Sequence, residues 1–398
     1  MAFDESIHRR DARDAQPIDS VGGPDPGARE VTRADLDLID DLFDDPTHGE
    51  PGRDRMAVHL LWETVLLVGI AVLVLRIHRD VPHLLSGDEL NRLLVAGAAL
   101  GLLAVAAGLT LRAAVPNLAL GPITIIAARY FDGNPDPAAA IGPALLAATL
   151  LGLALAVIVV GLHVPAWAAS LAVGLAVIAL VKPSVEVFGP PAWDPLRYSG
   201  YLAGGVAALS VLGGLFGMIK VIRRTLGRFR PVADPAQRRG VGAAVVSGAV
   251  LLASVVLAVF AGALLAAAPQ VWSASALEWS GLALGAALLG GASAFGRRGG
   301  IFGNVLAIAL LTLTVAYVGE RGWDVGPGAV AAGAILLGLV VTRLVETFGR
   351  PRPVPVGDDG SPDDPSDDWR GPWSDPQDSW SFPLPAQPTD RRSHLRGR

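Results

Sequence analysis

The polar side chains inside the long apolar stretches of this sequence are almost all neutral, so hydrogen bonding is the chemistry that they offer. Glu63 is the main ionisable exception and lies near the start of the first stretch. Neutral groups of this kind suit a path for an uncharged hydroxylated solute, or a protein that only transmits a conformational change. The neutral candidates are Asn117, Asn304, Thr312, Thr314, Ser280 and Ser293.

Several kinds of chemistry are excluded by the residues that are missing. There is no cysteine, so no disulfide or thiolate site can form. The sequence has no GxxxxGK[ST] phosphate loop, no HExxH zinc motif and no GxSxG nucleophile motif. Ion-coupled carriers and intramembrane enzymes need acids, bases or metal ligands at membrane depth. We therefore expect no catalytic residue, no metal site and no cofactor on this chain.

A stretch rich in proline and glycine interrupts one apolar segment. Ala113–Pro122 has the sequence AAVPNLALGP. Proline removes a backbone donor and clashes with the preceding turn, so the freed backbone groups need partners from neighbouring protein or from a water-filled cavity. Two interpretations stay open: a broken helix that lines a substrate path, or a proline kink held by packing. The candidate path residues are Pro116, Asn117, Leu118, Gly121, Pro122 and Asn304.

The elements that must position these residues are long apolar segments. Of the 398 residues 52% are hydrophobic and only 17% are charged, against about 25% charged in soluble domains. Apolar runs of about 20 residues span a hydrocarbon core of about 30 Å. We expect an all-α polytopic membrane protein. The ten predicted segments are Val58–Leu75, Leu93–Leu111, Val115–Phe131, Ala138–Val160, Pro165–Val181, Gly200–Met218, Val241–Ala268, Leu277–Phe295, Ile301–Gly319 and Pro327–Val341.

The most basic connection between two apolar runs is Lys220–Gly240, with the sequence KVIRRTLGRFRPVADPAQRRG. Short loops rich in Lys and Arg stay in the cytoplasm. This loop therefore predicts a multi-pass protein of the plasma membrane with both termini in the cytoplasm. Arg297 and Arg298 agree with that orientation, whereas the first outer loop, RIHRDVPHLLSGDELNR, contains three arginines and disagrees.

Three regions follow from the distribution of charge. Residues 1–55 are predicted to be cytoplasmic, polar and mostly disordered. Within them, Thr32–Asp45 is predicted to form an acidic amphipathic helix that docks on a partner or on the protein's own cytoplasmic face. Residues 56–347 form the transmembrane domain. Residues 348–398 are predicted to be a disordered cytoplasmic tail rich in Asp, Pro, Ser and Trp.

The ten segments divide into two halves of five that run in opposite directions. The third and eighth segments then correspond, and they contain NLALGPITIIAARYF (117–131) and GLALGAALLGGASAF (281–295). Both share Leu-Ala-Leu-Gly, which is weak support for an inverted repeat of the kind found in many transporters.

Three stretches resemble the membrane permease subunits of ABC importers of ribose and other monosaccharides. VPNLALGPITIIAARYF (115–131) is similar to the family's Gly/Asp-Leu-Ser-Val-Gly stretch. RPVADPAQRRGVGA (230–243) resembles its cytoplasmic Asn-Pro-Glu-Ala-Ala-Arg-x-x-Gly stretch. LGGASAFGRRGGIFGNVLAIALL (289–311) is the most similar of the three and comes close to the family's Gly-Gly-x-Ser-x-Phe-Gly-Gly-x-Gly-x-x-x-Gly pattern. The resemblance covers about residues 56–347.

The resemblance implies a permease subunit that works with a separate ATPase, an extracytoplasmic solute-binding protein and a second permease copy or paralogue. It departs from the family at Asn117 and Ala119, where the family has Asp and Ser, and it lacks the cytoplasmic Glu. A non-transporting scaffold derived from this fold and an ATPase-independent carrier remain as alternatives. The segment that would dock on the ATPase consists of Asp234, Pro235, Ala236, Gln237, Arg238, Arg239 and Gly240.

Overall fold

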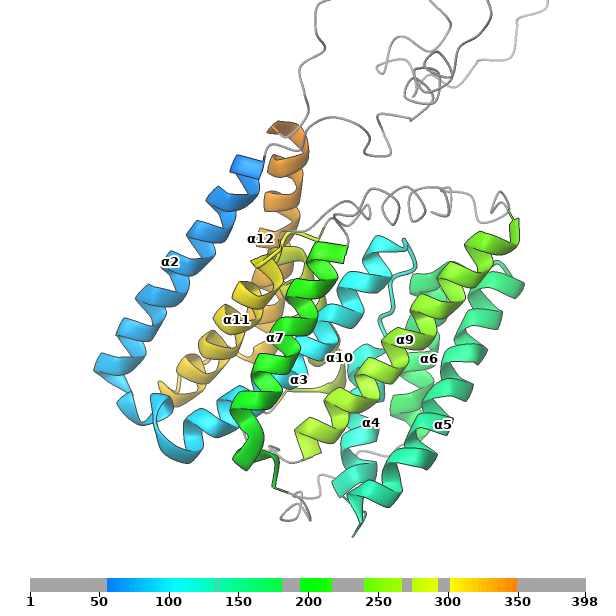
Figure 1. Cartoon of the computed structure of the whole chain (residues 1–398), viewed down its shortest axis with the longest axis horizontal. Helices are drawn as coiled ribbons and strands as arrows, with labels where there is room; N and C mark the ends of the chain where they lie inside the picture. Colours follow the sequence, from blue (N-terminus) through cyan, green and yellow to red (C-terminus); the bar gives the residue numbers. More distant parts are fainter. Residues whose placement is uncertain are drawn as a thin grey trace, which may run out of the picture. The chain divides into compact units, whose positions relative to one another are not determined.

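The computed structural model describes residues 56–132, 134, 136–180, 194–216, 240–266, 274–292 and 301–348, and every element within these ranges is helical. The predicted all-α class is therefore confirmed for this part of the chain (Figure 1). Its α-helices are α2 (Met56–Asp80), α3 (Gly87–Arg112), α4 (Leu120–Asp132), α5 (Pro137–Ala156), α6 (Ala166–Leu180), α7 (Ser199–Phe216), α9 (Gly240–Ala266), α10 (Ala276–Leu289), α11 (Gly303–Glu320) and α12 (Pro327–Phe348). Three short elements join them, η2 (Pro82–Leu85), η3 (Val157–Gly161) and η4 (Pro195–Tyr198).

Within the described ranges seven helices are long and apolar enough to cross a membrane, as expected of a polytopic membrane protein. Each of the ten predicted segments overlaps one helix, but α4, α6 and α10 are shorter, with 13, 15 and 14 residues. Ten complete crossings therefore stay a prediction. The seven long spans are Leu60–Asp80, Gly87–Arg112, Ala138–Gly161, Pro195–Phe216, Val241–Ala266, Gly303–Glu320 and Pro327–Leu344.

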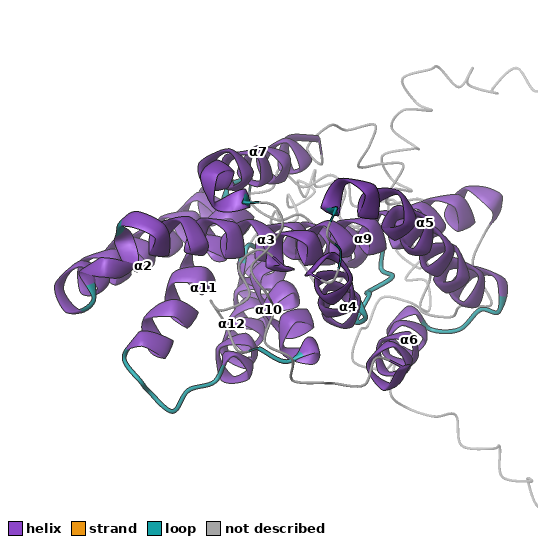
Figure 2. Ribbon diagram, turned by 90° about the horizontal axis from the view of Figure 1, so that it is seen from below, coloured by secondary structure: helices purple, strands orange, loops and turns teal. Residues whose placement is uncertain are grey.

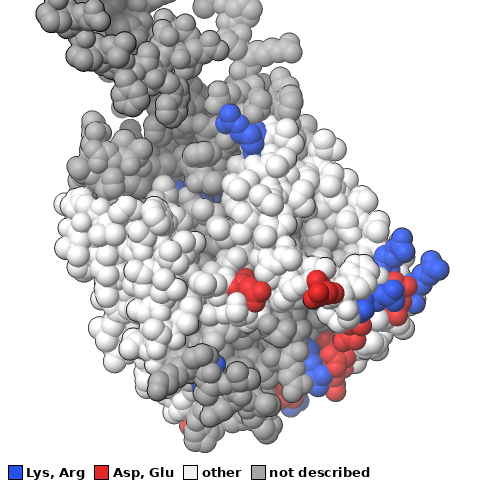
Figure 3. All heavy atoms as spheres, turned by 180° about the vertical axis from the view of Figure 1, so that it is seen from behind, with Lys and Arg blue, Asp and Glu red and all other residues white. Residues whose placement is uncertain are grey.

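Helices α3 and α9 lie at the centre of the described structure. Helix α3 packs against α7, α9, α10 and α11, and α9 packs against α3, α4 and α5. Figure 2 shows α2 at one edge of this arrangement and α5 and α6 at the other. On the face shown in Figure 3, most of the described surface is uncharged and the charged side chains gather mainly at one edge, as expected of helices in hydrocarbon.

Glycines let neighbouring helix backbones approach closely, which is the usual basis of helix packing in membranes. A Cβ atom added to Gly262 of α9 would lie 2.5 Å from the carbonyl oxygen of Thr124 in α4. A Cβ atom added to Gly338 of α12 would lie 2.6 Å from the Cβ atom of Leu288 in α10. The close contacts of α9 with α4 and of α12 with α10 therefore require glycine at these two positions.

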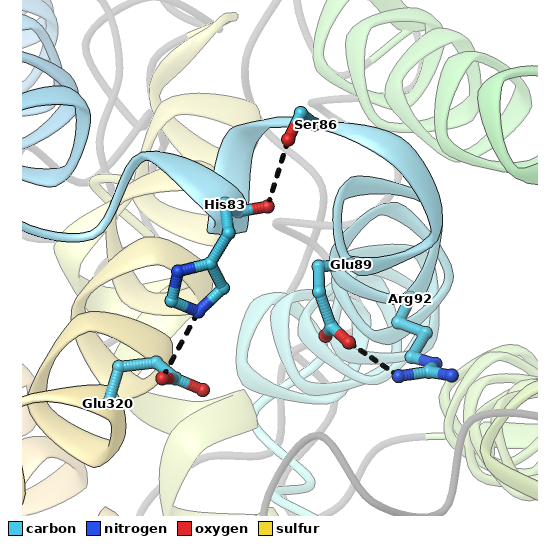
Figure 4. A network of polar contacts seen from close by, with 5 residues as sticks. All are labelled: His83, Ser86, Glu89, Arg92 and Glu320. Atoms are coloured by element: carbon cyan, nitrogen blue, oxygen red, sulfur yellow. Dashed lines mark hydrogen bonds and ion pairs between the residues drawn. The ribbon is translucent and has the colours of Figure 1, made fainter.

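Figure 4 shows contacts of side chains in the first outer loop of the sequence prediction. Arg92 Nη1 donates to Glu89 Oε1 at 2.6 Å, and His83 Nε2 lies 3.3 Å from Glu320 Oε2 at the end of α11. Asp80 Oδ2 accepts a hydrogen bond from the hydroxyl of Tyr317 at 2.7 Å. These contacts do not weaken the signal of the three arginines, because the positive-inside rule counts Lys and Arg and acids contribute little to it, so this loop still disagrees with the predicted orientation.

Helix α3 ends in a Schellman motif that has alanine where glycine is usual. The amide of Val115 donates to Thr110 O at 2.9 Å, and the amide of Ala114 donates to Leu111 O at 3.0 Å. Ala114 has a φ of 53°, in the left-handed region that favours glycine. The chain then stays non-helical as far as residue 119, at the place where the sequence predicts a break.

Ala114→Gly is expected to stabilise the protein by about 0.5–1 kcal/mol, because glycine relieves the left-handed strain while adding some freedom to the unfolded chain. Equilibrium unfolding in detergent micelles measures this change. Ala113→Gly is the matched control, since Ala113 has a φ of −82° and is 5% exposed. It should destabilise, and equal losses in both variants would contradict the assignment of strain to Ala114.

Candidate functional site

The break between α3 and α4 is held by Asn117, which is only 5% exposed. Its Oδ1 atom accepts a hydrogen bond from the amide of Ala119 at 2.9 Å and so forms an Asx turn immediately before α4. Its Nδ2 atom donates to Ser254 Oγ of α9 at 2.9 Å. Asn117 therefore links the segment before α4 to α9, and its side chain is buried among protein atoms.

Two further serines satisfy the backbone that the break leaves free. Ser170 Oγ of α6 accepts from the amide of Leu118 at 3.0 Å and donates to Pro116 O at 3.2 Å. Ser280 Oγ of α10 accepts from the amide of Gly121 at 2.8 Å and donates to Leu118 O at 2.8 Å. We call Asn117, Ser170, Ser254 and Ser280 the serine clamp. It meets the requirement that non-helical backbone at membrane depth be bonded by neighbouring protein.

The starts of the short helices α4 and α10 meet at Gly121. A Cβ atom added to Gly121 would overlap the carbonyl oxygen of Ala276 and lie 2.7 Å from the amide nitrogen of Ser280. Pro122, one residue further along α4, packs on α6, where its Cγ lies 3.3 Å from the position of a Cβ added to Gly174. The contact of α4 with α10 thus depends on a glycine at this position.

Helix α10 carries its own polar cap. Ser275 Oγ accepts from the amide of Glu278, and Glu278 Oε2 accepts from the amide of Ser275 at 2.6 Å, which completes a capping box. Glu278 Oε1 also accepts from the amide of Gly328 at 3.0 Å, at the start of α12. This carboxylate therefore lies at two helix N-termini, where the helix dipole favours negative charge.

Glu63, the acid singled out by the sequence, has a structural partner. Its Oε1 atom accepts from the amides of Phe302 and Gly303, both at 3.0 Å, at the start of α11. Next to it, Trp62 Nε1 donates to Leu289 O at 2.8 Å, at the end of α10. Helix α2 thus bonds to the start of α11 and to the end of α10, which explains a carboxylate near the start of an apolar helix without invoking ion transport.

Asn304 lies apart from the serine clamp, at the second position of α11. Its Nδ2 atom donates to Ser210 Oγ of α7 at 2.9 Å. Its Oδ1 atom is buried and has no hydrogen-bond partner among the described residues. The structure therefore brings Pro116, Asn117, Leu118, Gly121 and Pro122 together at one place, and Asn304 at another.

The other sequence candidates have local roles or lie outside the described ranges. Thr314 Oγ1 donates to Leu310 O in its own helix at 2.7 Å, and Thr312 lies against Gly97 of α3. Gly240 is the first residue of α9. The positions outside the described residues are Asp234, Pro235, Ala236, Gln237, Arg238, Arg239 and Ser293, together with the terminal regions 1–55 and 349–398.

Sequence reasoning missed Ser170 and Ser254, two clamp residues that are fully buried in α6 and α9. The available signal was a serine inside an otherwise apolar helix, alone in α6 and together with Ser247 in α9. Among the described residues no group of three or more His, Asp or Glu could hold a metal ion. The site can therefore form hydrogen bonds through neutral side chains, but within the described ranges it offers no ligand set for a metal.

The permease resemblance rests on sequence motifs, and comparison with known proteins adds nothing to it. No family model, no curated protein and no solved structure matches this chain.

Proposed function

We propose that the chain is the membrane permease subunit of an ABC-type importer that forms the path for a sugar or a similar small uncharged polar solute. A separate ATPase supplies the energy, and an extracytoplasmic binding protein delivers the solute. A second copy or a paralogue completes the pair of permeases. In this proposal the protein lies in the plasma membrane with both termini in the cytoplasm and crosses it about ten times.

The observation that carries the proposal is a set of helix contacts that occurs twice. Helix α9 packs on α4 and α5, and the corresponding helix α3 packs on α10 and α11. Helix α6 packs on α4, as α12 packs on α10. The two short helices α4 and α10 also contact each other, and so do α3 and α9. Two halves of five helices related by a twofold axis in the membrane plane would produce these pairs.

The neutral clamp supports an uncharged solute. Asn117 and Ser280 bind backbone groups of the break with bonds that sugar hydroxyls can replace. In the proposed cycle, separation of α4 from α10 frees these groups, and the path residues are Pro116, Asn117, Leu118, Gly121, Pro122 and Asn304. Within the described spans Glu63 bonds to a helix start, so an ion-coupled path has less support.

The ATPase partnership is tested by reversing two charges in the predicted docking segment. Arg238→Glu combined with Arg239→Glu should lower recovery of the ATPase by about tenfold in affinity purification from native membranes, because charge complementarity at a docking surface is lost. Mass spectrometry quantifies the recovered subunits. Arg223→Glu with Arg224→Glu changes the same charge in the same loop and should leave recovery unchanged. Equal recovery with all variants would reject this docking assignment, and absence of any ATPase from the wild-type sample would reject the importer.

The second candidate function is a non-transporting membrane scaffold derived from the permease fold. Burial of the serine clamp favours the scaffold, because side chains that are buried and bonded to the protein leave no polar group exposed for a solute. Ser170 and Ser254 are fully buried, and Asn117 is 5% exposed. Uptake in proteoliposomes separates the possibilities. ATP-dependent uptake supports the importer, uptake without the ATPase supports a carrier, and no uptake by an intact complex supports the scaffold.

A further inference from the structure

The described helices α3, α4, α5, α7 and α9 line an apolar chamber with a cavity volume of about 670 Å³ that is open on one side. Its walls include Leu102 of α3, Val206 and Leu209 of α7, and Phe260 of α9. The volume is in the range of small-molecule sites, which is about 300–1,000 Å³. None of the serine clamp residues lines it, so the chamber is separate from the candidate path.

The chamber has one polar end. Among the described lining residues Asp136 is the one acid, and its Oδ1 atom accepts from the amides of Ala138 and Ala139 at the start of α5. The wall on α7 runs from Tyr201 to Leu209, a distance of about 12 Å at 1.5 Å per residue. Sugar hydroxyls in such a chamber would lack hydrogen-bond partners, so it does not suit the solute of the proposed importer.

In the proposed inverted repeat α7 of the second half corresponds to α2 of the first half. The chamber exists because these two helices pack in different positions. Helix α2 packs along α11, whereas α7 packs mainly on α3 and not along α5, the counterpart of α11. The space that α7 leaves beside α5 and α9 is the chamber. Ile141 of α5 and Leu209 of α7 are each 43% exposed, and Phe260 of α9 is 40% exposed. The opening between these helices therefore carries apolar side chains at its rim.

The medium at that opening identifies the occupant. Helices α3, α5, α7 and α9 are all among the described helices that are long and apolar enough to cross a membrane, so in a bilayer the apolar rim of the opening would lie at the depth of the hydrocarbon. A bilayer lipid has the same polarity as the chamber, with an apolar chain and one polar end. We propose that the chamber binds one acyl chain of the bilayer phospholipid phosphatidylethanolamine, whose ammonium group lies beside the Asp136 carboxylate. This inference does not depend on the proposed transport function.

Gly205 provides a sharp test because it lines the chamber and a Cβ added to it meets nothing within 4 Å. Gly204 is the matched control, since a Cβ there also meets nothing within 4 Å but the residue does not line the chamber. In the experiment the full-length protein is reconstituted in phosphatidylethanolamine–phosphatidylglycerol vesicles that contain a phospholipid with a diazirine in its acyl chain. After illumination, mass spectrometry maps the labelled peptides.

The expected result is labelling of the chamber-lining part of α9 about tenfold above that of the lipid-exposed face of α12 at Leu336 and Leu337. Gly205→Trp should remove this excess, whereas Gly204→Trp should retain it. Ala263→Phe fills the chamber from the α9 side and replaces Gly205→Trp if that variant does not fold.

Three outcomes would overturn the proposal. The first is labelling of α9 no higher than that of α12, which is ordinary lipid contact. The second is an excess that survives both filling variants or disappears in the Gly204 control. The third is a dimer that becomes a monomer when the chamber is filled, without an excess of lipid label, because a second copy of the chain would then be the occupant.

Discussion

Replacing Gly121 with alanine is expected to destabilise the protein by about 3–5 kcal/mol, the largest effect of any single methyl group in the described structure. The added Cβ would overlap the carbonyl oxygen of Ala276 and lie 2.7 Å from the amide nitrogen of Ser280. Both are backbone atoms, so no side-chain rotation relieves the clash. Overpacking of this kind costs about 1–3 kcal/mol, and loss of the two Ser280 hydrogen bonds adds about 1 kcal/mol each.

The control for this prediction is Gly333→Ala on α12, where an added Cβ meets nothing within 4 Å. Alanine has the higher helix propensity, so this variant should be neutral or more stable by about 0.5–1 kcal/mol. Yield of folded protein and equilibrium unfolding in micelles measure both changes. A Gly121→Ala protein as stable as the Gly333→Ala protein would show that α4 and α10 are not in close contact.

The helices themselves follow from local sequence. Each predicted apolar segment overlaps one helix because burial in hydrocarbon requires runs of apolar residues and satisfied backbone groups. The break at residues 113–119 follows from Pro116 and the glycine and proline after it. Short-range rules thus locate the elements and the irregular backbone between α3 and α4.

The partners of the break do not follow from local sequence. Ser254 lies 137 positions from Asn117, and Ser280 lies 159 positions from Gly121. Serine is common in membrane helices, and only the packing of α9 and α10 against α4 selects these two. The chamber is equally non-local, because it depends on where α7 docks. Sequence analysis singled out Glu63 as the main ionisable residue inside an apolar segment. Its structural partner could not be predicted, because nothing near Glu63 in the sequence indicates that the start of α11 lies beside it.

Asn117→Leu is the second large expected effect, a loss of about 2–3 kcal/mol. Leucine has nearly the same shape but no polar atoms, so the amide of Ala119 loses its hydrogen-bond acceptor. Ser254→Ala removes the partner of Asn117 Nδ2 and should cost about 1 kcal/mol. If the two side chains act as a pair, the double variant will lose less unfolding free energy than the sum of the losses of the two single variants, by about 0.5–1 kcal/mol.

Unfolding of the four proteins of this double-mutant cycle gives the coupling free energy directly. Thr314→Val is the control, because Thr314 bonds only to Leu310 O in its own helix and its loss should cost under about 0.5 kcal/mol. Absence of coupling would contradict the bond between α4 and α9. Solute uptake measured on the same proteins then separates two roles of Asn117. If Asn117→Leu abolishes uptake while Ser254→Ala preserves it, Asn117 contacts the solute. If uptake falls in both variants in proportion to stability, Asn117 only holds the break closed.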